Sequence, residues 1–484
     1  MARGRSFSFG ADATMPYQPF IVPSLWQPSG MPLGTCLRTR RRIPLDAYLA
    51  QRDGVTKSLE IVFTGLKKSG KTTAMKLFSM ATMIQQAIGA DGEIEDMRMH
   101  IDNRKPEEAS AEWAGIVKSM ACDVIALRDL SLEMLDPVAL KTEWDILQTA
   151  MTGAEFIKGE PLSSAEVLAM RIAIFIIKRD RPAQLSTRLL ERVTRGLSVD
   201  DIDAFYRRVD DHLLVHYRSE LNDPESGVLY KSLAAVIQAK PDLDYLVIQA
   251  AAFQVATYLT LIFDGMFGRM FAGKQSIRDY LAEPAALFDM SGLSPTEVAF
   301  FETQRFNTMT AALNNNDLAA IPHVHIMEEV QEEGQHLLQA RAHAFQNAKA
   351  RASHKMGLSS TQYFPNLMYG ESGTELRDYA RQIYSGTDMF VIFQQPSDEE
   401  TWTMMRELEL DDSLIRFSQR LGRGCSIIKA RERDPLFVQW HIPPMMRELV
   451  QSSGATERML QRRPVMEDPR IRGLMERKEV GGTS

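Results

Sequence analysis

One eight-residue stretch, GLKKSGKT at positions 65–72, limits what this chain can fold into more than any other part of it. The apolar, β-branched run at 59–63 predicts a buried strand before it, and helix formers with apolar residues at helical spacing follow from position 71. Gly65 and Gly70 let the backbone curl so that successive N–H groups point at one anion, and the following helix directs its positive N-terminal end to the same place. The stretch therefore predicts a phosphate-binding loop between a strand and a helix.

The polar side chains of this loop predict a nucleotide and magnesium as its ligands. Lys71 is expected to reach the β and γ phosphates, and the Thr72 hydroxyl to complete the shell of a bound Mg²⁺. The loop contacts only phosphates, so it fits ATP and GTP alike; we take ATP and Mg²⁺ as the expected cofactors. A chance match in a basic surface turn is the alternative, and the flanking strand and helix argue against it. The expected nucleotide-binding residues are Gly65, Leu66, Lys67, Lys68, Ser69, Gly70, Lys71, Thr72 and Thr73.

Length and composition describe an ordinary globular chain with more than one compact unit. Its 484 residues exceed the size at which a single core usually stops growing. The net charge of -7 argues against a protein whose whole surface binds nucleic acid, although it leaves room for a local basic pore. Three cysteines lie far apart without metal-ligand spacing, which indicates a reducing compartment.

The order of predicted elements indicates an α/β fold. Strands expected at 97–101 and 123–127 enclose a helix at 109–121, and strand, helix, strand in this order is typical of a parallel sheet flanked by helices. Helical periodicity then dominates to about position 280, and the strand pattern returns at 285–288. The expected organisation is a flexible N-terminus with leading strands (1–57), the first part of the nucleotide domain (58–138), an all-helical insertion (139–281), the second part of the nucleotide domain (282–450) and a charged tail (451–484).

The most apolar stretch, 245–263, is long enough to raise the question of a membrane span. Gln249 and Gln254 interrupt it, and helical segments surround it, so a buried helix is favoured. The N-terminus also lacks the apolar segment of a signal peptide. Any membrane attachment is therefore expected to be peripheral.

Two polar positions at the ends of later strands are candidate catalytic residues. The apolar run at 323–327 leads into Glu328 and Glu329, and in a phosphate-loop protein one such carboxylate holds the Mg²⁺ shell through water while the other activates the attacking water. We assign the metal role to Glu328 and the base to Glu329. The alternative is that both acids open a solvated helix, where they favour the helix dipole. A strand expected at 355–360 is followed by Gln362, which is placed to contact the γ phosphate.

The order of these pieces resembles the ATPase domain of the TraC-type conjugation and type IV secretion ATPases, within the HerA/FtsK class of RecA-like motors. The resemblance implies a RecA-like P-loop NTPase fold with a mainly parallel central sheet flanked by helices and an all-α insertion. It places Glu328 where the family has an Asp, Glu329 at the catalytic acid and Gln362 at the γ-phosphate sensor. Arg351 matches a basic residue that acts across a subunit boundary in such rings; Arg341 is its rival, and an ordinary surface arginine is the alternative for both. The segments that carry the likeness are the phosphate loop, DNRKPEEASAEW with VIALRDLSLEMLDP, AALFDMSGL, EEVQ, STQ and RLGRGCSIIKARERDPLFVQWHIPP.

The function implied by the resemblance is an ATP-hydrolysing motor of conjugative or type IV secretion machinery. Its expected partners are further copies of itself, as a hexamer, other components of the machine, and DNA. Its expected location is the bacterial cytoplasm, at the inner face of the cytoplasmic membrane and held there through partners. Glu in place of Asp at position 328 keeps open an assembly platform that hydrolyses little. A HerA/FtsK-like DNA translocase or packaging motor is a further alternative.

Overall fold

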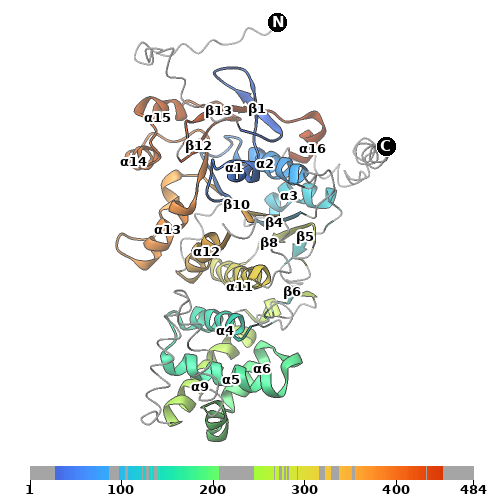
Figure 1. Cartoon of the computed structure of the whole chain (residues 1–484), viewed down its shortest axis with the longest axis vertical. Coiled ribbons are helices and arrows are strands. Elements are labelled where there is room, and N and C mark those ends of the chain that lie inside the picture. Colours follow the sequence, from blue (N-terminus) through green and yellow to red (C-terminus); the bar gives the residue numbers. More distant parts are fainter. Residues whose placement is uncertain are drawn as a thin grey trace. The chain divides into compact units, whose positions relative to one another are not determined.

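The computed structural model describes residues 28–86, 97–103, 107–120, 122, 124–126, 130–131, 133, 135, 140, 142–206, 245–265, 267–271, 275–276, 280, 283–290, 293–314, 322–328, 337–350, 355–431 and 433–450. The chain divides into two compact units. The first unit comprises 1–99, 322–332 and 350–484, and the second comprises 100–321 and 333–349. Figure 1 shows their elements coloured along the sequence.

A mixed sheet organises the first unit. Its hydrogen-bonded order is β2-β1-β13-β12-β11-β3-β10-β9. The neighbours β11, β3, β10 and β9 run parallel, whereas β12, β13, β1 and β2 pair antiparallel. The strands are β1 (Pro32–Cys36), β2 (Arg42–Pro44), β3 (Glu60–Thr64), β9 (His323–Met327), β10 (Lys355–Thr361), β11 (Met389–Ile392), β12 (Cys425–Ala430) and β13 (Leu436–Trp440).

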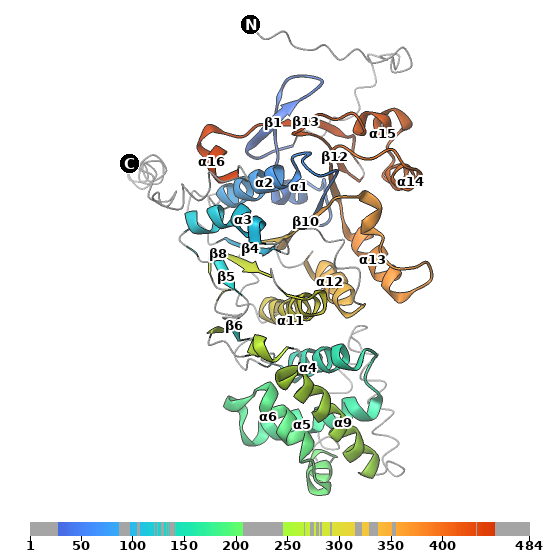
Figure 2. The ribbon, with the colours of Figure 1, turned by 180° about the vertical axis from the view of Figure 1, so that it is seen from behind.

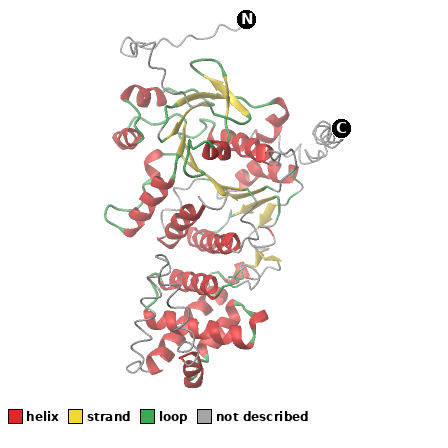
Figure 3. Cartoon of the chain, viewed as in Figure 1, coloured by secondary structure: helices red, strands yellow, loops and turns green. Residues whose placement is uncertain are grey.

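Helices flank this sheet, as Figure 3 shows by secondary structure. The longest, α2 (Lys71–Gln86), packs on β3, where the Phe63 and Phe78 rings meet edge to face with centroids 6.1 Å apart. The helix α1 (Ala47–Arg52) was not expected, because 19–57 showed only extended pieces and turns; Asp46 begins it by accepting a bond from the Leu49 N–H. The remaining helical segments are η7 (Phe364–Leu367), α13 (Glu375–Gly386), α14 (Glu399–Glu407), α15 (Asp412–Ser418), η8 (Pro444–Met446) and α16 (Arg447–Val450).

The carboxylate of Asp388 ties the start of β11 to the start of β3. Its Oδ2 accepts from the backbone N–H of Lys57 at 2.5 Å and of Ser58 at 2.7 Å. Two backbone donors that precede β3 are thereby satisfied by a side chain that precedes β11. The two strands then enter the sheet in register, with Met389 opposite Ile61.

The second unit combines a short strand array with a group of helices. β4 (Arg98–Asn103) enters this unit at position 100, and the strand order within the unit is β4-β8-β5. A separate two-stranded sheet pairs β6 with β7 in parallel. The other elements are α3 (Glu107–Ser119), β5 (Val124–Ala126), β6 (Leu130–Ser131), α4 (Glu143–Lys158), α5 (Ser164–Asp180), η3 (Pro182–Gln184), α6 (Thr187–Arg195), α9 (Tyr245–Asp264), η5 (Gly268–Phe271), β7 (Gln275–Ser276), β8 (Ala285–Asp289), α11 (Pro295–Asn314) and α12 (Leu337–Ala350).

The expectation that 139–281 is wholly helical is corrected by β7. Helices dominate the described part of this segment, but residues 275 and 276 pair with β6. Two-residue strands carry no periodicity, which is why the sequence pattern did not indicate them. The domain boundaries at 138/139 and 281/282 stay a prediction.

Helices α4, α5, α6 and α9 pack around shared apolar cores, and Figure 2 shows them from behind. In one of these cores the Phe267 and Phe300 rings stack with centroids 4.2 Å apart. α9 is the one helix among the described residues that is long and apolar enough to cross a membrane. The sequence predicted a buried helix; one face of α9 is buried, whereas the opposite face is exposed, so the prediction holds for one face only.

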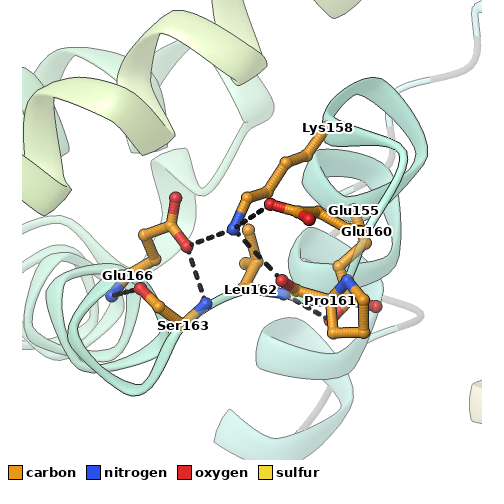
Figure 4. Close-up of polar contacts among 7 residues, drawn as sticks. All are labelled: Glu155, Lys158, Glu160, Pro161, Leu162, Ser163 and Glu166. Atoms are coloured by element: carbon orange, nitrogen blue, oxygen red, sulfur yellow. Dashed lines mark hydrogen bonds and ion pairs between the residues drawn. The ribbon is translucent and has the colours of Figure 1, made fainter.

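Side chains satisfy the backbone at the turn between α4 and α5 (Figure 4). Lys158, at the end of α4, donates to Glu166 Oε2 at 2.8 Å. The same Oε2 accepts from the Ser163 N–H at 2.6 Å, and Ser163 Oγ accepts from the Glu166 N–H at 3.3 Å, which is a capping box. Glu155 accepts from the Leu162 N–H at 3.2 Å. The turn is therefore held by charged groups from both helices.

The Glu166 pair predicts a pH dependence of stability. Burial alone raises the pKa of Glu166, but the bonds from Lys158 and Ser163 outweigh it, so the net pKa is lowered from 4.5. A lowered folded pKa contributes stability above the unfolded pKa and loses it as pH falls through the folded one. We expect Glu166→Gln to lower the free energy of unfolding by about 1–2 kcal/mol at pH 7, and this difference to shrink below about pH 4.5. Urea unfolding followed by circular dichroism at several pH values measures it.

Glu160→Gln is the matched control, because Glu160 lies 3.4 Å from the same Lys158 Nζ but its side chain is 69% exposed. Its expected effect is small. Equal losses of stability at pH 7 in the two variants would contradict the role assigned to Glu166.

Candidate functional site

The loop between β3 and α2 has the backbone that the sequence predicted. Its φ angles are +147° at Gly65, +63° at Lys68 and +109° at Gly70. A Cβ on Gly65 would lie 2.7 Å from Phe393 Cβ, and one on Gly70 would lie 3.2 Å from Gly424 N. Glycine is needed at both positions, for conformation and for space.

Backbone hydrogen bonds brace this loop from three neighbouring segments. One is the end of β10, one follows β11 and one is the turn before β12. The curl is therefore held by the sheet and by that turn. The bonds are Gly65 N–H to Thr361 O at 3.3 Å, Leu66 N–H to Gln394 O at 2.9 Å, and Gly424 N–H to Ser69 O at 2.8 Å.

The groups inside the curl fit a phosphate. The N–H groups of Lys67, Lys68 and Gly70 donate to no protein acceptor among the described residues. Ser69 Oγ is buried and likewise has no hydrogen-bond partner in the described part of the chain. The Lys71 ammonium donates to Gly65 O and, at 3.1 Å, to Leu66 O, which places a cation within the loop. Open donors, a buried hydroxyl and a cation together make an anion site.

The first turn of α2 carries the two threonines of the predicted site. Thr72 and Thr73 are half-buried and follow the Lys71 that begins the helix. A hydroxyl at this position is the type of ligand that Mg²⁺ takes beside nucleotide phosphates. Thr72 therefore fits the metal role predicted for it.

Glu328 lies at the same edge of the sheet as this loop. β9 pairs with β10 in parallel, Met327 opposite Ser359, and β10 pairs with β3 in parallel, Thr361 opposite Thr64. Parallel strands end at one edge, so the residues that follow them gather there. Glu328 is fully buried and outside α12, which begins at Leu337. Its side chain therefore does not lie on a solvated surface. Glu329 lies outside the described residues.

Gln362 follows β10, the strand between β3 and β9. Its side chain is half-buried. The next residue, Tyr363, donates through its hydroxyl to Asp398 Oδ1 at 2.8 Å, and burial together with this bond raises the pKa of Tyr363 to about 12. The bond ties the segment after β10 to the N-cap of α14, so Gln362 leaves the sheet in a fixed direction.

Gln395 is a residue of this edge for which the sequence indicated no role. Its side chain is buried after β11, and Nε2 donates to Thr64 Oγ1 at 3.4 Å and to Phe393 O at 3.2 Å. It therefore contacts the last residue of β3, directly before the phosphate loop. In the sequence, two glutamines follow a strongly apolar run. Only the pairing of β11 with β3 shows that the second of them lies beside the strand that precedes the phosphate loop.

The two candidate arginines differ in what the structure describes. Arg351 lies outside the described residues. Arg341, on α12 in the second unit, has its Nη1 3.5 Å from Glu155 Oε2. The rival candidate thus already has an acidic partner within its own unit.

Solved structures with a similar fold exist. VirB4 of Thermoanaerobacter pseudethanolicus matches with a TM-score of 0.56 and 12% identity, over 86% of this chain and 97% of that one. The bacterial conjugative coupling protein TrwB in an unbound form gives 0.48 and 13% over 86% and 91%, and TrwB in complex with ADP and Mg²⁺ gives 0.48 and 13% over 83% and 88%. No protein-family model matches the chain, and no curated protein sequence matches it.

The fold assignment rests on the similarity to VirB4, because the TM-scores of the TrwB structures are too low to support it. At this identity it shows the fold alone. The predicted fold class, a P-loop NTPase with a mainly parallel central sheet flanked by helices, is confirmed. The resemblance to type IV secretion ATPases is confirmed at the level of the fold.

Gly65→Ala tests whether the curl is the binding site. The added methyl meets Phe393 Cβ at a φ of +147°, which costs on the order of 1–3 kcal/mol and displaces the N–H groups. We expect affinity for ATP with Mg²⁺ to fall by roughly tenfold or more. Isothermal titration calorimetry measures this. Gly422→Ala is the matched control, since a Cβ there meets nothing within 4 Å; equal affinities in the two variants would rule out the assignment.

Proposed function

We propose that this chain is an ATP-binding and ATP-hydrolysing motor of the kind used by conjugation and type IV secretion machinery. The observation that carries the proposal is the braced phosphate loop with the Lys71 ammonium inside it, at the sheet edge where Glu328 follows β9, one strand beyond β10. A nucleoside triphosphate fits this arrangement, because the N–H groups without a protein acceptor and the lysine cation complement the negative charge of its phosphates.

The roles follow from the order of strands at the loop. Lys71 binds the β and γ phosphates and so stabilises charge that develops during transfer. Bound Mg²⁺ supplies further neutralisation of the phosphates, with Thr72 and Glu328 as the residues that hold it. Glu329 orients and deprotonates the attacking water, and Gln362, from the strand between, contacts the γ phosphate. Arg351 of a neighbouring copy completes the site.

The setting of the motor is supported by the fold shared with VirB4 and by the order of motifs. We propose a homo-oligomer, a hexamer, at the cytoplasmic face of a bacterial membrane, working with other components of a secretion or conjugation machine. DNA is a partner of this proposal. The net charge of -7 gives no support to a motor that grips DNA over its whole surface.

A nucleotide-dependent assembly platform is the second candidate function. Glu328 stands where the resembled family has the shorter Asp, and its side chain is fully buried, so it has little freedom to adjust its reach. This favours tight binding with slow turnover. The platform and the motor differ in one quantity, the rate of hydrolysis per bound nucleotide.

ATP turnover against protein concentration separates these functions. We expect specific activity to rise as copies associate, because Arg351 acts across a subunit boundary, and to rise further with DNA. Lys71→Ala should abolish nucleotide binding and turnover, whereas Lys118→Ala, which removes the same charge from an exposed position on α3, should leave both unchanged. Unchanged turnover in Lys71→Ala would end the site assignment, and binding without turnover at every concentration would favour the platform.

The acidic pair gives a second test. Glu329→Gln should retain ATP and lower turnover by roughly 10²–10⁴-fold, since a general base contributes about that factor. Glu328→Gln should instead raise the Mg²⁺ concentration that half-saturates activity, and Glu328→Asp should increase turnover if the longer side chain limits it. Magnesium titrations of single-turnover hydrolysis measure all three. Normal turnover in Glu329→Gln would move the base to Glu328.

A further inference from the structure

Helix α9 exposes an apolar stripe that the proposed motor does not use. The leucine and phenylalanine side chains on this stripe are strongly exposed, with 58% for Phe253 and 48% for Leu261. Positions 246, 250, 253, 257 and 261 recur every three or four residues, so they share one face of the helix. No charged residue lies between Tyr245 and Phe263. The stripe extends over about 22 Å at 1.5 Å per residue.

The opposite face of α9 is committed to the helical core of the second unit. Its buried side chains line one side of the helix and pack against α4, α5 and α6. A helix held in this way cannot be surrounded by lipid on all sides. The buried residues are Ile248, Ala251, Ala252, Val255, Ala256, Leu259, Ile262 and Phe263.

A row of arginines lies on α6, which packs against α9. Arg188, Arg192 and Arg195 are spaced by four and three residues and are all exposed, so they lie on one face of α6. The Arg188 guanidinium lies 5.2 Å from the Phe263 ring centroid, and that of Arg195 lies 5.4 Å from the centroid of Phe253. The cationic row therefore flanks the part of α9 from Phe253 onward.

The polar contacts of this row leave its charge positive. Arg195 donates through Nη2 to Thr260 Oγ1 at 2.9 Å and through Nε to Glu191 Oε1 at 2.6 Å. Glu191 has a side chain only 12% exposed, whereas that of Arg195 is 42% exposed. At the other end of α9, Tyr245 donates to Asp203, so its first turn has an acidic neighbour. The apolar and cationic surfaces coincide only around Phe253 and Leu261.

We propose that this face, the α9 stripe with the α6 arginines, binds the surface of an anionic lipid bilayer, with α9 lying in the plane of the membrane. An apolar stripe rimmed by arginines matches the boundary between acyl chains and phosphate headgroups. Phe253 and Leu261 enter that boundary, and the arginines contact lipid phosphates while their stems cover apolar surface. A nucleic acid would use the arginines but would leave the stripe in water.

A protein partner is the less favoured occupant of this face. From Phe253 to Leu261 the exposed and half-buried positions of α9 carry four hydrogen-bonding side chains. The hydroxyls of Tyr258 and Thr260 already bond to Glu166 and to Ala256 O, which leaves chiefly the Gln254 amide and the Thr257 hydroxyl. The Thr257 hydroxyl already donates to Phe253 O at 2.8 Å. A surface with so little directional hydrogen bonding suits a fluid apolar boundary better than a specific protein surface.

Flotation of the full chain with lipid vesicles tests the proposal. We expect binding to vesicles of phosphatidylcholine with phosphatidylglycerol, weak binding to phosphatidylcholine alone, and loss of binding at high salt. Phe253→Gln with Leu261→Gln should weaken binding by roughly tenfold or more. Replacing Arg188, Arg192 and Arg195 by Gln should weaken it by roughly fivefold per arginine and remove the preference for the anionic lipid.

Matched controls remove the same groups elsewhere. Ile84→Gln changes an apolar side chain on α2 that is 41% exposed, and Arg381→Gln with Arg406→Gln and Arg416→Gln removes three exposed arginines from α13, α14 and α15. Both should bind vesicles as the unmodified chain does. Circular dichroism establishes that each variant is folded, and the arginine set, being exposed, keeps the test available if the stripe variant unfolds.

Three results would overturn the proposal. The first is vesicle binding that does not distinguish the stripe and arginine variants from their controls, which includes a complete lack of binding to anionic vesicles at low salt. The second is a loss of self-association in the stripe variant, measured by light scattering, without a loss of vesicle binding, which would make the stripe a contact between copies. The third is a loss of DNA binding in the arginine variant alone, with vesicle binding intact, which would assign the row to nucleic acid.

Discussion

The parallel pairing of β3 with β10 on one side and β11 on the other is the constraint on which the proposed site depends. It brings the carboxyl ends of three strands to one edge of the sheet, where Thr361, Gln394 and the phosphate loop meet through backbone bonds. At the opposite ends of the strands, Asp388 accepts two N–H groups from the segment before β3 and so fixes that pairing. A loop that must curl around an anion has few internal bonds, so its shape has to be imposed from outside.

The same pairing explains why the acidic strand is separated from the loop by β10. Glu328 and the loop both follow parallel strands, and Gln362 leaves the strand between them. In the proposed mechanism the attacking water and the terminal phosphate lie outside these strand ends, where a polar side chain from the middle strand reaches both. Glu328 is buried, and a carboxylate interacts more strongly with a cation where solvent is excluded. Burial therefore strengthens the attraction between Glu328 and the Mg²⁺ of the proposed site.

Much of the site was predictable because its elements are local. The run 59–63 differs from β3 by one residue at each end, 323–327 is identical to β9, and Lys71 begins α2 as expected, since apolar β-branched runs and capped helices carry their signals in neighbouring residues. Gln395 was not predictable, because its contact with Thr64 joins strands 331 positions apart. The helix α1 was missed for another reason: six residues are too few for a periodic pattern.

The sequence by itself determined the phosphate loop, the strand before it, the helix after it and the helical character of the α9 segment. Each of these depends on residue types and their spacing among residues that are close neighbours in the sequence. Only the tertiary structure decided which strands lie beside the loop and which face of α9 stays exposed. Strand order and helix exposure result from packing between distant segments. An apolar side chain of α9 is equally apolar on the buried face and on the exposed face, so the sequence does not distinguish the two faces.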